Sequence, residues 1–393
     1  MKLIYIGYGI DKKSCDNQIG ASVAGNNMQL GLLNVLYENM KDDLKVISIY
    51  PTASYPKEKK IFFKRHKMNI NSNICSNLIT FINLPFIKEL TQGISVIRES
   101  YKIIKKDRNF KILTFNARPS ISLPTFFLKK VYKIESVCLL ADPPVDIQKR
   151  YGIDKVIRNK FWKLIERNIK LYDKVIALNK YAIELYAPNK PHIIVDGAIE
   201  LEDYNHDLVL TKIENSKNIV LFTGALTEYN GIIELVEAMK YIDDKNIELH
   251  IYGDGPLKKF IEEQSISMSN LFYKGVAPNE EIKKLQAKAS LLVNPRRVDD
   301  LISKVTFPSK MIEYMLSGTP VLSTKLNGLS EEYFENIYTI RELDPNKLAE
   351  DIKETLRIDK EELEKKSKQA IEFILTNKTW KVQGEKIHKF LME

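Results

Sequence analysis

Short apolar runs alternate with amphipathic, helix-like stretches along both halves of this 393-residue chain. The first half carries the runs KLIYIGYGI, LKVISIY, KILTF and SVCLLAD, and the second half carries NIVLFTGAL, IELHIYGDG, LLVNP and PVLSTKL. Strands separated by helices at this spacing are typical of parallel sheets with helices on both faces. The alternation therefore predicts an α/β fold built from doubly wound sheets.

The length of the chain and one polar stretch predict two domains. A chain of this length exceeds one ordinary hydrophobic core. The sequence GAIELEDYNHDLVLTKIENS, at 197–216, is polar and acidic and separates the two series of strands. We predict a Rossmann-like N-terminal domain over 1–200, a linker over 201–216 and a C-terminal domain over 217–375. We expect 376–393 to form a helix that crosses back to the N-terminal domain.

Composition narrows the class of protein. The net charge of +9 indicates an anionic partner, but the basic residues are scattered and no nucleic-acid-binding motif is present, so nucleic acid is not expected. No apolar run approaches the roughly 20 residues that cross a bilayer, and the N-terminus lacks a secretory cleavage pattern, which predicts a cytoplasmic protein. Cys15, Cys75 and Cys138 have no metal-ligand spacing and are predicted to be reduced thiols.

A long loop, GYGIDKKSCDNQIGASVAG, follows the first predicted strand. It is too long for a tight dinucleotide-binding turn. Its small residues Gly20, Ala21 and Ser22 would let a ligand approach the backbone, or they could simply form a surface loop with a glycine-assisted helix start.

Three glycines, Gly224, Gly253 and Gly255, follow predicted strands in the second half. Each could serve only a turn. Three such sites in series favour a ligand-facing edge, because ligands of open α/β sheets bind at the carboxyl ends of strands. Helix N-termini at such an edge suit a phosphate-bearing ligand.

Charged residues follow the strand LLVNP and begin the helical pattern FPSKMIEYMLSGTP. We expect Arg296 to contact an anion, because guanidinium groups bind phosphate oxygens bidentately, whereas Arg297 could belong to a solvated loop. The helix start at Pro308 could point N–H groups at a diphosphate, with Lys310 adding a charge. Glu313 can accept hydrogen bonds from both hydroxyls of a ribose diol, or it could form a surface ion pair with Lys310.

Taken together, the second half resembles family 4 glycosyltransferases, because it carries in their order the motifs LFTGAL…YNGI, LHIYGDGPL, LFYKGVAPNEEI, LLVNPR, FPSKMIEYMLSGTPVLSTKLNGLSEEY and DPNKLAEDI. The resemblance covers 217–357 and is weaker in the N-terminal half. It implies the GT-B fold, in which two facing Rossmann-like domains enclose a cleft. It also implies that a sugar moves from a UDP- or GDP-linked donor to a saccharide or lipid-linked acceptor, with retention of configuration and without a metal or other cofactor. The motifs are most similar to those of bacterial enzymes that assemble exopolysaccharide, capsule and O-antigen.

The resemblance also implies roles for individual residues. In the family, the glutamate that matches Glu313 holds the donor ribose, and the loop that matches Gly20 to Ser22 lies over the donor phosphates. Gly253 and Gly255 would lie near the base and ribose. Arg296 and Lys310 match basic positions of this branch and would neutralise the leaving diphosphate.

The acceptor side rests on one candidate. Asp142 ends the strand in LLADPP and could orient the acceptor hydroxyl, or it could cap the turn before Pro143. In this family the leaving phosphate is usually taken to accept the acceptor proton, so no dedicated pair of carboxylates is expected.

Three positions depart from the family pattern. Val305 stands eight residues before Glu313, where many members have a second acid, and Ala225 and Asn230 replace an Arg and a Lys. These departures keep a second hypothesis open, in which the chain is a non-catalytic subunit that binds and stabilises a partner enzyme. A sugar-nucleotide epimerase is a third hypothesis, although it would need acid–base side chains that the sequence does not clearly supply.

Two basic segments with aromatic residues suggest peripheral contact with an anionic membrane, at the inner face of the plasma membrane. Residues 56–69 surround Phe62 and Phe63 with lysines and an arginine, and 156–174 form a basic helical pattern with Phe161 and Trp162. We favour the first segment, because the second could be a helix packed on the sheet with a solvated basic face.

Overall fold

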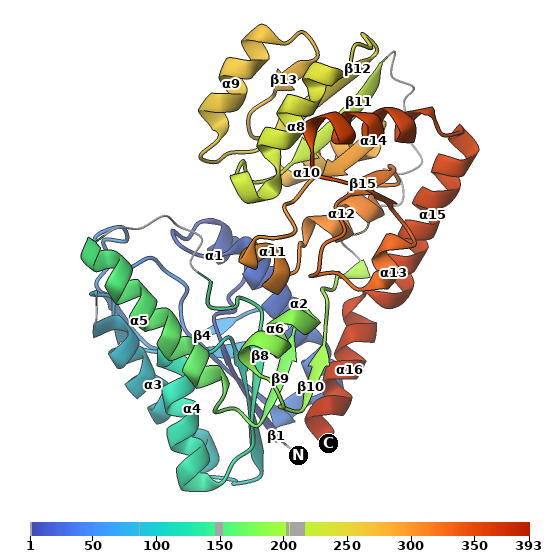
Figure 1. The fold of residues 1–393 in the computed structure, drawn as a ribbon. Helices are drawn as coiled ribbons and strands as arrows, with labels where there is room; N and C mark the ends of the chain where they lie inside the picture. Colours follow the sequence, from blue (N-terminus) through green and yellow to red (C-terminus); the bar gives the residue numbers. More distant parts are fainter. Residues whose placement is uncertain (1, 86, 146–151, 202–203, 205–216) are drawn as a thin grey trace. The chain divides into compact units, whose positions relative to one another are not determined.

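The computed structural model describes residues 2–85, 87–145, 152–201, 204 and 217–393, which form two compact units (Figure 1). Unit 1 comprises the chain up to Ala198 together with Trp380–Glu393, and unit 2 comprises Ile199–Thr379. The predicted linker, apart from Leu201 and Tyr204, lies outside the described residues. The chain therefore leaves unit 1 after Ala198 and returns to it at Trp380.

Unit 1 is built on an eight-stranded sheet with the order β10-β9-β8-β7-β1-β2-β5-β4. All neighbours are parallel except β4 and β5, which are antiparallel. The strands are β1 (Lys2–Gly7), β2 (Leu44–Ser48), β4 (His66–Asn69), β5 (Cys75–Leu78), β7 (Phe110–Phe115), β8 (Ser136–Leu140), β9 (Lys174–Ala177) and β10 (His192–Ile194). A separate antiparallel pair joins β3 (Phe62–Phe63) to β6 (Phe81–Ile82). The strand order reverses between β1 and β7, which marks the edge where ligands of such sheets bind.

Helices cover both faces of this sheet. They are α1 (Lys12–Asp16), α2 (Val23–Met40), α3 (Ile87–Ile104), α4 (Pro119–Tyr132), α5 (Gly152–Ile169), α6 (Lys180–Tyr186) and α16 (Trp380–Met392), with a short 3-10 helix, η1 (Lys41–Asp43). Ile4 and Ile6 pack with residues of α3 and α4, whereas the Tyr5 hydroxyl donates to Gln29 of α2. Successive residues of one strand thus point to opposite layers, which is why these strands are apolar throughout.

The last helix, α16, packs against α2 through two glycines. A Cβ atom on Gly31 would lie 2.0 Å from the Trp380 indole nitrogen, and one on Gly384 would lie 2.0 Å from a methyl carbon of Val35. Each glycine therefore makes room for a larger side chain of the opposite helix. This contact ties the C-terminal segment to unit 1.

Unit 2 has a six-stranded sheet with the order β13-β12-β11-β14-β15-β16, parallel throughout. Its strands are β11 (Asn218–Thr223), β12 (Ile247–Tyr252), β13 (Leu271–Tyr273), β14 (Leu291–Asn294), β15 (Val321–Ser323) and β16 (Tyr338–Thr339). Its helices are η3 (Glu228–Asn230), α8 (Ile232–Ala238), η4 (Met239–Tyr241), α9 (Lys258–Ser267), α10 (Asn279–Lys288), α11 (Leu301–Val305), α12 (Lys310–Leu316), α13 (Glu331–Phe334), α14 (Pro345–Arg357) and α15 (Lys360–Asn377). This is the order of a Rossmann-type sheet, with the reversal between β11 and β14.

The predicted α/β fold class with two Rossmann-like domains is confirmed. The sequence did not predict β4 and β5, which lie in the irregular insertion at 52–95 and have no long apolar run. Cys75 and Asn69 pair at the edge of the sheet, where side chains can be polar because solvent covers one side. None of the described helices has the length and apolarity needed to cross a bilayer.

Candidate functional site

In unit 2, two glycines bring the ends of β11 and β12 together. Gly224 has φ +137° and Gly253 has φ +147°, and a Cβ atom on Gly253 would lie 1.8 Å from the Gly224 carbonyl oxygen. The Gly224 amide donates to the Tyr252 carbonyl oxygen at 3.0 Å. Gly255 lies in the same turn, where a Cβ atom would be 2.5 Å from the Leu226 carbonyl oxygen. The three predicted glycines therefore form one packed edge at the carboxyl ends of the strands.

Lys310, at the start of α12, points its ammonium group at this edge. A Cβ atom on Gly224 would lie 2.9 Å from Lys310 Nζ, so only glycine leaves room for the lysine. Nζ is inaccessible to solvent and has no hydrogen-bond partner among the described residues. Burial, with a smaller contribution from Arg296, lowers the pKa of Lys310 to about 7, whereas Glu313 opposes the shift. An unpartnered buried cation is ready to receive an anion.

The backbone at the start of α12 offers fewer free N–H groups than the sequence suggested. The helix begins at Lys310 instead of Pro308. The amides of Met311 and Ile312 already donate to the carbonyl oxygens of Pro308 and Ser309. The Lys310 side chain, and not a row of free amides, is therefore the cationic group that this segment presents at the strand edge.

Glu313 lies on the exposed side of α12, with no hydrogen bond or ion pair to the described part of the chain. The surrounding protein partly shields the Glu313 carboxyl group from water, and this desolvation raises its pKa. The charges of Lys283 and Lys310 oppose that shift. The surface ion pair with Lys310, the alternative that the sequence left open, does not form, which leaves the carboxylate free to accept hydrogen bonds from a ligand.

Arg296 is buried, with only 7% of its surface exposed. Its guanidinium donates to the Ser303 hydroxyl at 2.9 Å and to the Thr306 hydroxyl at 2.9 Å, and it lies 5.4 Å from the centre of the Tyr229 ring. These contacts attach α11 to the end of β14. Arg296 thus has a structural role beside the phosphate-binding role that the sequence suggested, and its charge is felt at Lys310. Arg297 instead pairs with Glu234, at 2.6 Å.

The three departures from the family pattern have structural explanations. Val305 is 1% exposed and packs in the interior, so this position cannot present a side chain to a ligand. The Asn230 amide donates to the Ala225 carbonyl oxygen at 2.7 Å and holds the loop after β11. Lys310 lies at the same loop and is the cation nearest to Gly224.

In unit 1, the loop of Gly20, Ala21 and Ser22 leads into α2. Gly20 has φ +87° and packs so tightly that a Cβ atom would lie 2.6 Å from the Ala53 amide nitrogen. The Ser22 hydroxyl accepts from the Gly25 amide at 3.1 Å and caps α2. The loop is largely exposed and lies at the N-terminus of an 18-residue helix, as a phosphate-facing loop would.

Asp142 follows β8 at the same edge of the unit 1 sheet. The Asn116 side chain donates to its carboxylate at 3.0 Å and accepts from the Asp142 amide at 2.8 Å, with φ +62° at Asn116. Burial raises the pKa of Asp142, opposed by Asn116 and by the charge of Arg118. The carboxylate is thus oriented by a neighbouring strand end and does not merely cap a turn.

Sequence reasoning missed Arg118, which follows β7 in the motif NARPS. Its guanidinium pairs with Glu89 at 2.5 Å, and its charge acts on both Asp142 and Lys88. The rule that selected Arg296, an arginine just after a buried strand, would have selected Arg118 as well. The switch point of unit 1 therefore carries its own charged cluster.

No three His, Cys, Asp or Glu side chains gather in a metal-binding arrangement within the described parts of the chain. The two side chains near the unit 2 edge that could meet a diphosphate, Lys310 and Arg296, are cationic. Neither has an oxygen atom that could bind a hard metal ion such as Mg²⁺.

Two Rossmann-type units in one chain are the architecture of the GT-B fold of glycosyltransferases. Residues 217–357 match the family described as "Glycosyl transferases group 1". An uncharacterised glycosyltransferase of Methanocaldococcus jannaschii is 28% identical over 294 residues, which cover 72% of this chain and 76% of that protein.

Solved structures agree on the fold. Sucrose-phosphate synthase from Thermosynechococcus elongatus superposes with a TM-score of 0.68 at 16% identity, covering 100% of this chain and 98% of that one. Anabaena HepE, solved in complex with UDP, gives a TM-score of 0.64 at 14% identity and 100% coverage of both chains. At these identities the likeness establishes the fold alone.

Proposed function

We propose that this protein is a retaining glycosyltransferase that transfers a sugar from a UDP- or GDP-linked donor to a saccharide or lipid-linked saccharide, without a bound metal. The observation that carries the proposal is the buried, unpartnered ammonium group of Lys310 beside Gly224, at the strand edge of the family-matching region. A diphosphate placed there would supply the missing anionic partner. HepE, a structural neighbour, was solved with UDP, which supports a nucleotide donor.

The proposed mechanism distributes the work among a few groups. Lys310 neutralises the negative charge that develops on the diphosphate as the bond to the anomeric carbon breaks. Glu313 holds the ribose diol and fixes the position of the donor. The acceptor oxygen attacks on the same face, and its proton passes to the leaving phosphate oxygen. Asp142 orients the acceptor hydroxyl, with Asn116 holding its carboxylate in place.

A panel of UDP- and GDP-sugars tests this proposal. With excess EDTA present, one donor should be slowly hydrolysed, and nucleotide release should increase when a suitable saccharide is added. Strict dependence on Mg²⁺ or Mn²⁺ would contradict the metal-free mechanism. An epimerase would instead change the sugar stereochemistry without an acceptor.

A non-catalytic subunit remains a second candidate, favoured by the buried Val305 and by Asn230, which is committed to Ala225. Such a subunit would not turn over any donor, with or without an acceptor. Nucleotide binding measured on the isolated chain shows whether such a subunit has kept a donor site or has lost it.

The proposal extends to an anionic membrane surface, in support of surface polysaccharide synthesis from a lipid-linked acceptor. Phe63 cannot take part as we expected, because it is 7% exposed and stacks on Phe81 at 4.6 Å in the core. Phe62 is exposed and stays available.

The structure adds exposed apolar side chains on α3 and α4, which pack side by side (Figure 1). These side chains are Ile87, Leu90, Ile94, Leu123, Phe127 and Val131. Lysines and arginines are exposed beside them, including Arg98 and Lys130. Apolar side chains next to basic ones suit the interface of an anionic bilayer.

A further inference from the structure

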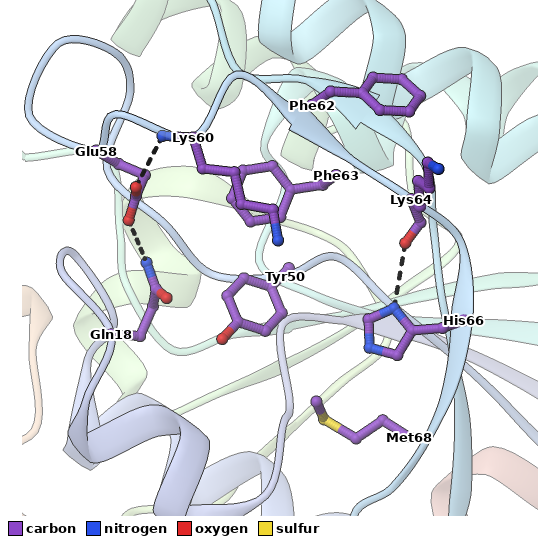
Figure 2. A pocket seen from close by; sticks show the side chains of 9 residues that line it. All are labelled: Gln18, Tyr50, Glu58, Lys60, Phe62, Phe63, Lys64, His66 and Met68. Carbon is purple, nitrogen blue, oxygen red and sulfur yellow. Dashed lines mark hydrogen bonds between the residues drawn. The ribbon is translucent and has the colours of Figure 1, made fainter.

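A pocket of about 500 Å³ lies in unit 1, where the insertion after β2 meets the loop before α2. Figure 2 shows the side chains of the 9 residues that line it: Gln18, Tyr50, Glu58, Lys60, Phe62, Phe63, Lys64, His66 and Met68. A volume of this order holds a small ligand. The proposed mechanism uses none of these residues, and only the segment 56–69 among them has been considered above, for membrane contact.

One wall of the pocket is aromatic and rigid. The rings of Tyr50 and Phe63 lie 5.5 Å apart, and Phe63 stacks on the buried Phe81 with an interplanar angle of 3°. The Phe62 side chain points away from this wall (Figure 2). Fixed aromatic rings offer a flat apolar surface, which suits the C–H face of a sugar ring.

More lysine than acidic side chains line the pocket. Lys60 Nζ lies 4.9 Å from the centre of the Phe63 ring, and its side chain points into the pocket (Figure 2). Neither Lys60 nor Lys64 forms an ion pair within the described part of the chain. Glu58 is the one acid among the lining residues, and it accepts from Gln18 at 3.3 Å and from the Lys60 amide at 2.9 Å. Lys60 and Lys64 therefore line the pocket without a direct ion pair among the described residues, although Glu58 lies within electrostatic reach of Lys60.

The pocket is connected to the charged edge of the unit 1 sheet through Thr52. The Gln18 side chain donates to the Thr52 hydroxyl at 2.9 Å, and Lys88 Nζ donates to the Thr52 carbonyl oxygen at 2.5 Å. Lys88 in turn is within electrostatic reach of Arg118, which acts on Asp142. An acceptor whose reactive hydroxyl lies at Asp142 could extend toward the pocket along this path.

We infer that this pocket binds a sugar unit that carries an anionic group, a carboxylate or a phosphate, within the acceptor. The aromatic wall would receive the ring, and Lys60 and Lys64 would receive the charge. This inference rests on the proposed function, because it assigns the pocket to the acceptor of that reaction. It predicts that the preferred acceptor is an acidic saccharide.

Direct titration of the full chain tests the inference without any enzymatic assay. Glucuronic acid and glucose 6-phosphate should bind, as measured by calorimetry or NMR. Glucose, which has the ring but no charge, and inorganic phosphate, which has the charge but no ring, are the comparison ligands. The variant Lys60→Gln/Lys64→Gln should weaken binding of both acidic sugars by at least about 10-fold, because it removes both charges. Tyr50→Leu should weaken binding of the acidic sugars more than that of phosphate.

The matched control is Lys57→Gln/Lys59→Gln, which removes two exposed lysines of the same segment that do not line the pocket. It should leave binding unchanged. The inference would be overturned if glucose or inorganic phosphate bound as tightly as the acidic sugars, or if the control variant lost as much affinity as Lys60→Gln/Lys64→Gln. It would also be overturned if no acidic sugar bound.

Nucleoside diphosphate binding, measured on the same samples, distinguishes the two proposals. If the wild-type chain binds the nucleotide but no acidic sugar, the pocket assignment fails and the proposed function stands. If it binds the acidic sugar but neither binds nor turns over a nucleotide donor, the proposed function fails instead.

Discussion

The ammonium nitrogen of Lys310 lies 4.3 Å from the centre of the Phe222 ring, and no described residue accepts a hydrogen bond from it. The ring face offers partial compensation for the charge, since aromatic rings attract cations. An anion from outside the chain would complete the compensation while the amine is protonated. The relationship between these two residues therefore leads to our first prediction.

Binding of UDP or GDP should weaken as the pH rises from about 6 to 9, because the pKa of Lys310 near 7 lets the free protein lose this charge. The folded-state pKa lies below the unfolded value of 10.5, so the native state binds fewer protons between these values. The contribution of Lys310 to stability should therefore rise with pH across that window, opposite to affinity. Titration calorimetry at a series of pH values measures the affinity, and thermal unfolding at the same pH values measures the stability.

Lys310→Met should remove most of this pH dependence, whereas the exposed control Lys368→Met should keep it. Affinity that is independent of pH in the wild-type chain would show that Lys310 does not contact the diphosphate.

Replacing Glu313 with Gln should lower kcat/KM by about 10²-fold, on the order of 3 kcal/mol of transition-state binding. The side chain is exposed and makes no described contact, so the melting temperature should stay within a few degrees of the wild type. Glu372→Gln, at another exposed carboxylate of unit 2, is the control. Near-normal turnover in folded Glu313→Gln would remove the ribose assignment.

Replacing Arg296 with Met should reduce the free energy of unfolding by about 2 kcal/mol, because the Ser303 and Thr306 hydroxyls lose a charged donor in a buried setting. Arg297→Met should cost less, since its pair with Glu234 is partly exposed. Denaturant titration compares the two variants. A smaller loss for Arg296 than for Arg297 would contradict the structural role of Arg296.

Val305→Glu should destabilise the protein and should not create a second sugar-binding acid. The side chain is in the interior, where an unpaired carboxylate is costly. Val305→Ile, which keeps the position apolar, should be close to neutral. A Val305→Glu protein with wild-type stability and higher activity would show that the site opens toward the ligand.

Sedimentation with liposomes tests the membrane contact. The wild-type chain should pellet with anionic vesicles, and less so as salt is added. Leu90→Gln/Ile94→Gln/Phe127→Gln should reduce the bound fraction several-fold. Ile266→Gln, which changes the 88% exposed isoleucine of unit 2, should not. A wild-type chain that stays in the supernatant at low salt would refute the attachment.

The sequence by itself determined the α/β class, the division into two sheets and the positions of most strands, because buried parallel strands must be apolar on both faces. It also selected Lys310, Glu313 and the glycines after β11 and β12, since strand ends are where such sheets bind ligands. It missed β4 and β5, whose edge position lets polar residues occupy them.

Only the tertiary structure decided what the selected side chains do. Arg296 and Lys310 are both basic residues near strand ends. Arg296 donates hydrogen bonds to the hydroxyls of Ser303 and Thr306, whereas the Lys310 ammonium group has no hydrogen-bond partner among the described residues. Phe62 and Phe63 are neighbours in sequence, and the alternation of a strand exposes one and buries the other against Phe81. Contacts between residues far apart in the chain set the burial and pairing of each group, and these determine whether it serves stability or a ligand.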